Sequence, residues 1–249
     1  MNRAKLTCAI CQPHYLPWIG YFEMIDRVDV FVLLDDVQFI KREWKNRNRI
    51  RKGPTGSDTK WLTVPVTKEC QRSLLKDARI SNVHNWTAAH FESLQHTYRN
   101  TSFVFDHLMG LNEISEMYRD SSLADLNDAL VTHICQQLGI TTRLIKSSEL
   151  HVNGKREDKL LNICKAIGAD VYLANNSTGQ YVQAEFFQRD GVDFVLQDYQ
   201  HPEYKQTWKG RGLPFLSHLS IVDLLFNQGK QSLEIIRKGR ANFESNCSG

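Results

Sequence analysis

The chain has 249 residues, of which 41% are hydrophobic and 24% charged, values that are ordinary for a soluble globular protein. They exclude a disordered chain, a collagen and a coiled coil, and the length allows a full hydrophobic core without cross-links. The net charge of +3 is too small to indicate nucleic-acid binding by itself.

The N-terminal region predicts a βαβ unit. Leu6–Cys11 is short and apolar and stops before Pro13, which is typical of a buried strand. Ile19–Arg27 has apolar residues on one helical face, and Val28–Leu34 is a β-branched run that favours a second strand. Cys8 and Cys11 have the CxxC spacing, but residues three apart in a strand point to opposite faces, so we expect no zinc site.

The middle of the chain predicts mainly helices. Strands are expected at Trp61–Val66 and Asp77–Ile80, and helices at Asn85–Tyr98, Phe103–Tyr118 and Leu123–Leu138. We therefore expect one domain over residues 1–249 with a helical insertion or lid at about residues 85–138.

Strands and helices alternate again in the C-terminal part. The predicted elements are strands at Arg143–Ile145, Val171–Ala174 and Asp193–Leu196, and helices at Glu157–Ile167 and from Ser220 through Phe226. Alternation of this kind predicts an α/β fold with a mostly parallel, Rossmann-like sheet covered by helices.

The loop after the first predicted strand is the first candidate site. In open parallel sheets, ligands bind at the carboxyl ends of the strands. Candidate substrate-binding residues in this loop are Gln12, Tyr15 and Trp18, and His14 is a candidate general acid or base near neutral pH. The alternative is a rigid turn whose aromatic residues only pack in the core.

Carboxylates follow the second predicted strand. Asp35 and Asp36 are candidate catalytic residues that could position an amine, hold a ribose or bind a metal, and Gln38 is a candidate substrate ligand. The alternative is a helix cap or a solvated loop. We expect no dedicated metal site.

The segment Lys41–Lys52 has seven cations and one anion, a net charge of +6, so the rest of the chain sums to −3. Arginines and lysines bind phosphates, tryptophan stacks on rings, and asparagine adds directional hydrogen bonds. The candidate substrate-binding residues are Lys41, Trp44, Asn46, Arg47, Asn48 and Arg49. The alternative is a solvated basic face, and a nucleic-acid patch would need wider basic character.

Two later loops also follow predicted strands. The first contributes the candidate substrate ligands Ser177, Gly179 and Tyr181. The second contributes Tyr204 as a candidate ligand and His201 as a candidate catalytic base, although a lone histidine is more often structural.

Several familiar motifs are absent from the sequence. It contains no GxxxxGK[ST] loop, no GxGxxG after a strand, no GxSxG elbow and no HExxH. No apolar run approaches the length of a membrane helix or of a signal-peptide core, so we expect a cytoplasmic protein.

The runs QPHYLPWIGYF, DDVQF, KREWKNRNRI, WLTVPV, YLANNSTGQY, YQHPEYKQ and LSIVDLLFNQG resemble the WbqC-like family, in order and over nearly the whole chain. This resemblance implies a place in O-antigen or other surface-polysaccharide (lipopolysaccharide) biosynthesis. It also implies transfer of glycine or another aminoacyl group.

A second resemblance concerns the fold. A strand, a proline-containing loop and a glycine at a helix start are similar to the nucleotidyltransferases that carry HxGH, among them pantothenate synthetase. Trp18-Ile19-Gly20-Tyr21 would occupy that motif, and both of its histidines are missing.

The leading hypothesis is therefore a transferase that moves an acyl or aminoacyl group onto an amino- or hydroxyl-bearing nucleotide sugar. The runner-up is an adenylate-forming ligase or nucleotidyltransferase that uses ATP with Mg²⁺, and the third is a non-catalytic phosphate- or nucleic-acid-binding module. Whether ATP, CoA or an acyl carrier activates the donor stays open, as does the oligomeric state.

Overall fold

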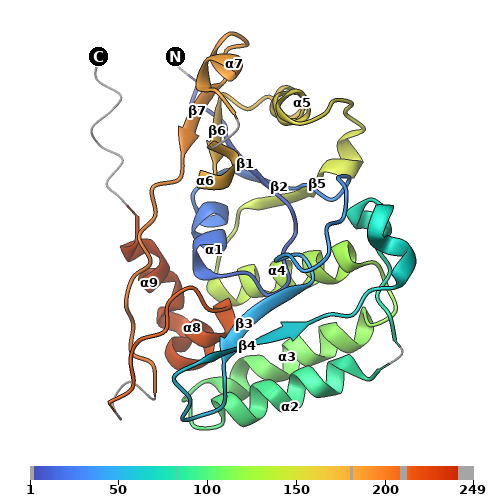
Figure 1. Ribbon diagram of the computed structural model, residues 1–249. Coiled ribbons are helices and arrows are strands. Elements are labelled where there is room, and N and C mark those ends of the chain that lie inside the picture. Colours follow the sequence, from blue (N-terminus) through green and yellow to red (C-terminus); the bar gives the residue numbers. More distant parts are fainter. Residues whose placement is uncertain (1–2, 83, 180–181, 208–211, 241–249) are drawn as a thin grey trace.

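The computed structural model describes residues 3–240, except residues 83, 180–181 and 208–211. In this part of the chain, five parallel strands form a sheet in the order β5-β2-β1-β6-β7 (Figure 1). The strands of this sheet are β1 (Thr7–Cys11), β2 (Val30–Leu33), β5 (Arg143–Lys146), β6 (Val171–Ala174) and β7 (Asp193–Leu196). The prediction of an α/β fold with a mostly parallel sheet is confirmed.

A two-stranded antiparallel ribbon accompanies the sheet and consists of β3 (Arg47–Arg51) and β4 (Thr59–Thr63). The α-helices are α1 (Ile19–Asp26), α2 (Trp86–Tyr98), α3 (Val104–Met117), α4 (Leu123–Leu138), α5 (Glu157–Ile167), α6 (Asn176–Gly179), α7 (Ala184–Gln188), α8 (Ile221–Gln228) and α9 (Ser232–Lys238). Gly139 and Gly168 end α4 and α5 in the left-handed conformation, at φ of 75° and 71°, which only glycine adopts without strain.

The two faces of the sheet have separate apolar clusters, because alternate strand residues point to opposite sides. Cys8 and Tyr172 pack on one face with residues of α5 and α7. Cys11 and Leu173 pack on the other face with residues of α1 and α4. The prediction that Cys8 and Cys11 point to opposite faces is therefore confirmed.

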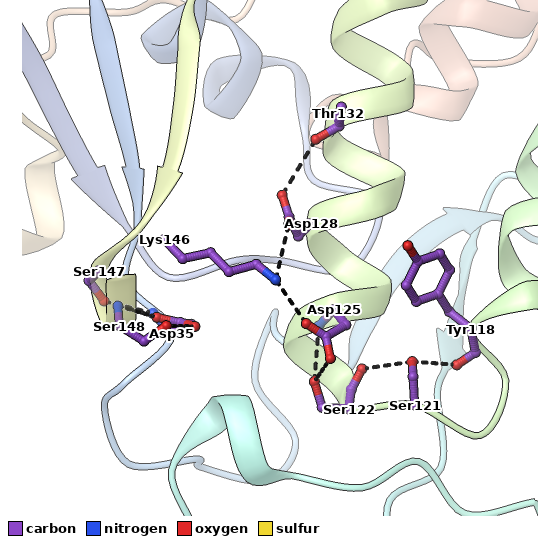
Figure 2. A network of polar contacts seen from close by, with 10 residues as sticks. All are labelled: Asp35, Tyr118, Ser121, Ser122, Asp125, Asp128, Thr132, Lys146, Ser147 and Ser148. Carbon is purple, nitrogen blue, oxygen red and sulfur yellow. Dashed lines mark hydrogen bonds and ion pairs between the residues drawn. The ribbon is translucent and has the colours of Figure 1, made fainter. Parts of the chain in front are cut away.

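The helical segment at residues 85–138 shares the second cluster with the sheet. Its last helix is also attached to the sheet edge, where Lys146 at the end of β5 contacts Asp125 at 2.8 Å and Asp128 at 3.3 Å (Figure 2). Burial alone would lower the pKa of Lys146, but its hydrogen bond to Asp125 and the charges of both carboxylates raise it. The segment is thus packed into the main core.

Some predicted elements differ from the structure. Asp77–Ile80 is not a strand, because Leu75–Asp77 forms a 3₁₀ turn and Ile80 makes only an isolated bridge to Val66. The strand expected at Trp61–Val66 begins and ends earlier, as β4. The basic segment contains β3, and the helices α7 and α9 were not expected from the sequence pattern.

Candidate functional site

The strand order determines where a crevice opens. The chain passes from β1 to β2 and β5 on one side of β1, and then crosses to β6 and β7 on its other side. The loops that follow β1 and β6 therefore diverge, which is where ligands bind in open parallel sheets. The structure has two adjoining cavities at this switch point, and His14, Trp18 and Trp44 line both of them.

The inner cavity has a volume of about 250 Å³. In addition to the three shared residues, its walls include Cys11, Gly20, Tyr21, Met24, Asn175, Asn176, Gln197 and Tyr199. The outer cavity has a volume of about 220 Å³, and its further walls are Asn48, Arg49 and His218. The inner cavity thus has the side-chain amides of Asn175, Asn176 and Gln197 in its wall, and the outer cavity has the cation of Arg49.

His14 lines both cavities from the loop that follows β1. Its ring packs against Tyr21 with 5.3 Å between centroids. Burial of the ring, with the charge of Lys45 nearby, lowers the pKa of His14 to about 3. The imidazole is therefore neutral near pH 7, and one of its nitrogens can accept a proton.

Lys45 is a charged residue of this region that the sequence pattern did not single out. Its side chain is buried, at 4% exposure, and its ammonium contacts Glu43. Burial lowers the pKa of Lys45 to about 8. No sequence signal separates Lys45 from the exposed cations of the same segment, because its burial depends on the loop around it.

Trp18 forms a wall shared by the two cavities at the start of α1. A Cβ atom on Gly20 would lie 2.2 Å from the Trp18 ring, so the indole packs directly on this glycine. The Trp18 ring also stacks with the rings of His218 and His201, with 5.2 Å and 6.1 Å between centroids. The structure therefore brings the predicted residues His14, Trp18 and His201 into one region.

The β3–β4 ribbon contributes Asn48 and Arg49 to the wall of the outer cavity, and its Arg47 and Trp61 lie outside that wall. The guanidinium of Arg47 lies 4.1 Å from the Trp61 ring centroid, and that of Arg49 lies 5.6 Å from Trp44. Trp44 and Trp61 are 42% and 43% exposed. Within the described residues, neither arginine forms an ion pair with a carboxylate, so the cations are available to an anionic ligand.

The asparagines of the basic segment hold backbone in place. The Nδ2 atom of Asn46 donates to the Val64 carbonyl at 3.1 Å, and that of Asn48 donates to the Leu16 carbonyl at 2.7 Å. Their amide donors are thus engaged, although Asn48 also lines the outer cavity. Lys41 is exposed and lines neither cavity.

Asp35 and Asp36 lie at the end of β2, outside the linings of both cavities. Asp35 is buried and accepts hydrogen bonds from the Ser147 hydroxyl and from the backbone and hydroxyl of Ser148, as Figure 2 shows. Burial alone would raise the pKa of Asp36, but Lys159, at 2.6 Å, and Ser147 lower it. Gln38 is exposed.

Other candidates of the first loop and the C-terminal loop are deeply packed. The Tyr15 hydroxyl hydrogen-bonds His90 Nδ1 at 2.8 Å, and Gln12 lines neither cavity. The Tyr204 hydroxyl donates to Asp223 at 2.7 Å, and Tyr98 and Gln206 also donate to this carboxylate.

In the loop after β6, the cavity residues are Asn175 and Asn176, which precede the residues predicted there. Ser177 and Gly179 belong to the short helix α6, and Tyr181 lies outside the described residues. A Cβ atom on Gly179 would lie 2.5 Å from the Leu196 side chain, so this glycine allows close packing on β7. Asn175 and Asn176 come directly after β6, and this position at the end of a strand is the signal that could have identified them.

A larger cavity of about 840 Å³ lies away from the switch point, with walls that include Phe103, Lys205 and Gly229. We place the candidate site in the smaller pair of cavities, because their walls combine the strand ends with the Arg49 guanidinium and the neutral His14. Among the described residues, no three His, Cys, Asp or Glu side chains gather as metal ligands. No helix in the same part of the chain is long and apolar enough to cross a membrane.

The comparisons with known proteins agree with the sequence resemblance. The model of the WbqC-like protein family matches residues 12–235. The chain is 34% identical over 231 residues to "Uncharacterized protein Rv1507c" of Mycobacterium tuberculosis (strain ATCC 25618 / H37Rv), an alignment that covers 92% of this chain and 96% of that protein. No solved structure matches the chain.

Proposed function

This chain belongs to the WbqC-like protein family, and from that premise we propose that it is a transferase. It moves an acyl or aminoacyl group, such as glycyl, onto an amino- or hydroxyl-bearing nucleotide sugar of O-antigen or other surface-polysaccharide biosynthesis. The observation that carries the proposal is the outer cavity, where Arg49 has no carboxylate partner among the described residues and lies between aromatic rings.

The ribbon supports binding of the nucleotide diphosphate. Guanidinium groups bind phosphates through paired hydrogen bonds, and Arg47 and Arg49 are both half-buried beside Trp44 and Trp61. A base or sugar ring can stack on the exposed indoles while the phosphates contact the arginines. The low net charge of the chain favours this small anion over a long nucleic acid.

The inner cavity supports the reacting groups. A volume of about 250 Å³ suits a sugar ring or a small aminoacyl group. Asn176 lines this cavity from the start of α6, and its amide is the donor that we assign to the acyl carbonyl oxygen. The cavity adjoins the outer one at His14 and Trp18, so the two substrates meet there.

The chemistry uses His14 as the proton acceptor. The acceptor amine attacks the acyl carbon, a C–N bond forms, and the bond from that carbon to the donor's leaving group breaks. The neutral imidazole takes the proton from the attacking nitrogen and returns it to the leaving group. A bound diphosphate favours this step, because a nearby anion raises the pKa of a histidine.

Ligand binding is tested first by thermal melting with UDP-, dTDP- and GDP-glucose, CoA, and ATP with Mg²⁺. A ligand at about 100 times its Kd stabilises by about 2.7 kcal/mol. We expect a shift with at least one nucleotide sugar. A shift with ATP alone would instead support the adenylate-forming ligase.

The role of Arg49 is tested with Arg49→Gln. Loss of its contacts should weaken nucleotide-sugar binding about tenfold or more, since a charge-assisted hydrogen bond contributes about 1.5–3 kcal/mol. Lys52→Gln removes one charge from the same segment at an exposed position outside both cavities and is the matched control. Equal affinities of the two variants would contradict the proposal.

The role of His14 is tested with His14→Gln in an assay of the transfer itself. Mass spectrometry follows the nucleotide sugar incubated with glycine, ATP and Mg²⁺, or with an acyl-CoA. We expect kcat to fall about 10²-fold or more with little change in KM. Because the pKa of His14 is about 3 without ligand, kcat/KM, which reports the free enzyme, should not fall between about pH 8 and about pH 5 through protonation of this residue. An unchanged kcat would remove His14 from the mechanism.

A further inference from the structure

The outer cavity has a wall that comes from the C-terminal part of the chain. His218 lines this cavity together with Arg49, although the two residues are far apart in sequence. The His218 ring lies 4.8 Å from the ring of His201, and both rings stack on Trp18. One imidazole of the pair, His218, therefore lines a cavity that also holds the Arg49 guanidinium, and His201 packs against His218 without lining either cavity itself.

The hydrogen bonds of His201 determine which protonation state it has. Its Nδ1 atom lies 3.0 Å from the Pro202 carbonyl, which can only accept, so Nδ1 carries a proton. In the neutral ring, Nε2 is then an acceptor. Protonation converts Nε2 into a donor and gives the ring a positive charge.

The surroundings of the pair keep it neutral when no anion is present. Burial and the neighbouring His218 lower the pKa of His201 to about 4, and burial and the charge of Arg49 lower that of His218. Of the other titratable groups among the described residues, the Tyr204 phenol packs against His201, His14 lies across the cavity, and Tyr199 packs against the shared Trp18 ring. None of these groups is anionic near pH 7, so a bound anion would add a negative charge beside the two rings.

We propose that Arg49 and His218 form the binding position for a phosphate group, and that binding of the phosphate brings one proton from solvent onto the His201–His218 pair. His201 is a positioning residue in this arrangement, because its ring packs against His218 and lines neither cavity. The inference rests on the proposed function for the identity of the ligand, a nucleotide diphosphate. It assigns to His201 an anion-dependent role in place of the catalytic base expected from the sequence.

Proton uptake gives the binding a pH dependence that arginine alone does not give. The guanidinium stays charged at all relevant pH values, whereas an imidazole whose pKa is raised by a bound phosphate titrates near neutrality. The diphosphate diester of a nucleotide sugar does not itself titrate between about pH 6 and about pH 8, so the protons taken up from solvent are bound by the protein. Affinity should then fall about tenfold from about pH 6 to about pH 8.

The test is isothermal titration calorimetry of the full chain with UDP-, dTDP- and GDP-glucose, and with the ATP analogue AMP-PNP and Mg²⁺. Measurements at about pH 6 and about pH 8, each in two buffers of different ionisation enthalpy, give the number of protons bound. We expect uptake of close to one proton and the tenfold change in Kd for at least one nucleotide sugar.

His218→Gln should bind about fivefold or more weakly at about pH 6 and lose most of the pH dependence. His201→Gln should reduce the proton uptake while Trp18 keeps its position. His96→Gln, at an exposed position on α2 outside both cavities, is the matched control and should behave like the unchanged protein. AMP-PNP can itself exchange protons on binding. This contribution is the same for both proteins, so it cancels in the difference in proton uptake between the unchanged protein and His218→Gln.

The outcomes separate this inference from the proposed function. Binding of AMP-PNP alone, with proton uptake that His218→Gln abolishes, would support the phosphate position and contradict a nucleotide-sugar ligand. Binding of a nucleotide sugar with no proton uptake, or with the same pH dependence in His218→Gln, would overturn the inference and leave the proposed function intact. The absence of binding by every probe would overturn the phosphate position.

Discussion

Single residues in the cleft differ most from expectation in their charge. Lys45 belongs to a segment of net charge +6, yet it is buried and its pKa is lowered to about 8, while the pKa of His14 is lowered to about 3. Burial of a cation costs free energy unless a partner compensates. His14 in the cavity walls and the buried Lys45 near it are therefore two groups whose charged forms are disfavoured by burial, whereas Arg49 stays charged.

The cost of burying Lys45 predicts how stability changes with pH. The pKa of this amine is 10.5 when exposed and about 8 in the fold. Between these values the unfolded state binds more protons than the native state, so the free energy of unfolding rises as the pH rises. Below about pH 8, Lys45 is protonated in both the native and the unfolded state, so the free-energy cost of burying its charge is fully present.

Lys45→Met should therefore be more stable than the natural protein by about 2 kcal/mol near pH 7, with the difference shrinking as the pH rises to about 10. Glu43, the partner of Lys45, is 41% exposed and stays hydrated in the variant. Urea unfolding at several pH values measures this difference. A variant that is less stable at every pH would show that the ion pair outweighs the burial cost.

At the scale of an element, the start of α1 depends on the contact between Trp18 and Gly20. Gly20→Ala places a methyl group 2.2 Å from the indole, so Trp18 must move. We expect a loss of about 1–3 kcal/mol in stability from this overpacking. Nucleotide-sugar binding should weaken as well, because Trp18 lines both cavities.

The same substitution in a chain without the Trp18 indole tests whether the contact with this ring causes the loss of stability. In a chain that already carries Trp18→Ala, the change Gly20→Ala should be neutral or stabilising by up to about 1 kcal/mol, since alanine favours a helix more than glycine does. Thermal unfolding of the four combinations gives the coupling energy. Equal costs in both backgrounds would place the strain elsewhere than on Trp18.

At the scale of the whole molecule, a buried hydrogen-bond network joins distant parts of the chain. Asp223 on α8 accepts from Tyr98 on α2 and from Tyr204 and Gln206 of the C-terminal loop. Burial raises the pKa of Asp223 to about 6, although the three donors and the charge of Arg51 lower it in part. This network fixes the C-terminal loop, and with it His201, against the rest of the core.

Tyr204→Phe tests whether Tyr204 is a structural or a substrate-binding residue. Removal of one donor from a buried carboxylate should reduce the free energy of unfolding by about 1–3 kcal/mol. The Kd for a nucleotide sugar should stay within about twofold, because Tyr204 lines neither cavity. Chemical denaturation and calorimetry measure the two quantities, and a large rise in Kd without loss of stability would restore Tyr204 as a substrate ligand.

How much the sequence predicts differs between fold and site. Apolar periodicity was sufficient for β1, α1, β2 and the parallel sheet, because burial of alternate residues leaves a pattern in the chain. It failed for Asp77–Ile80, where the run is too short to distinguish a strand from a turn. Of the residues that the sequence singled out in the first loop and the basic segment, His14, Trp18, Trp44, Asn48 and Arg49 line the cavities, and their roles stay predictions.

The sequence by itself determined the family and the α/β class, because both depend on residue type and order. The tertiary structure alone decided which side chains line the two cavities. It buried Lys45, engaged Asp35 with Ser148, and brought His218 beside Arg49. These outcomes depend on how segments far apart in the chain pack together, and no local pattern of residues records that packing.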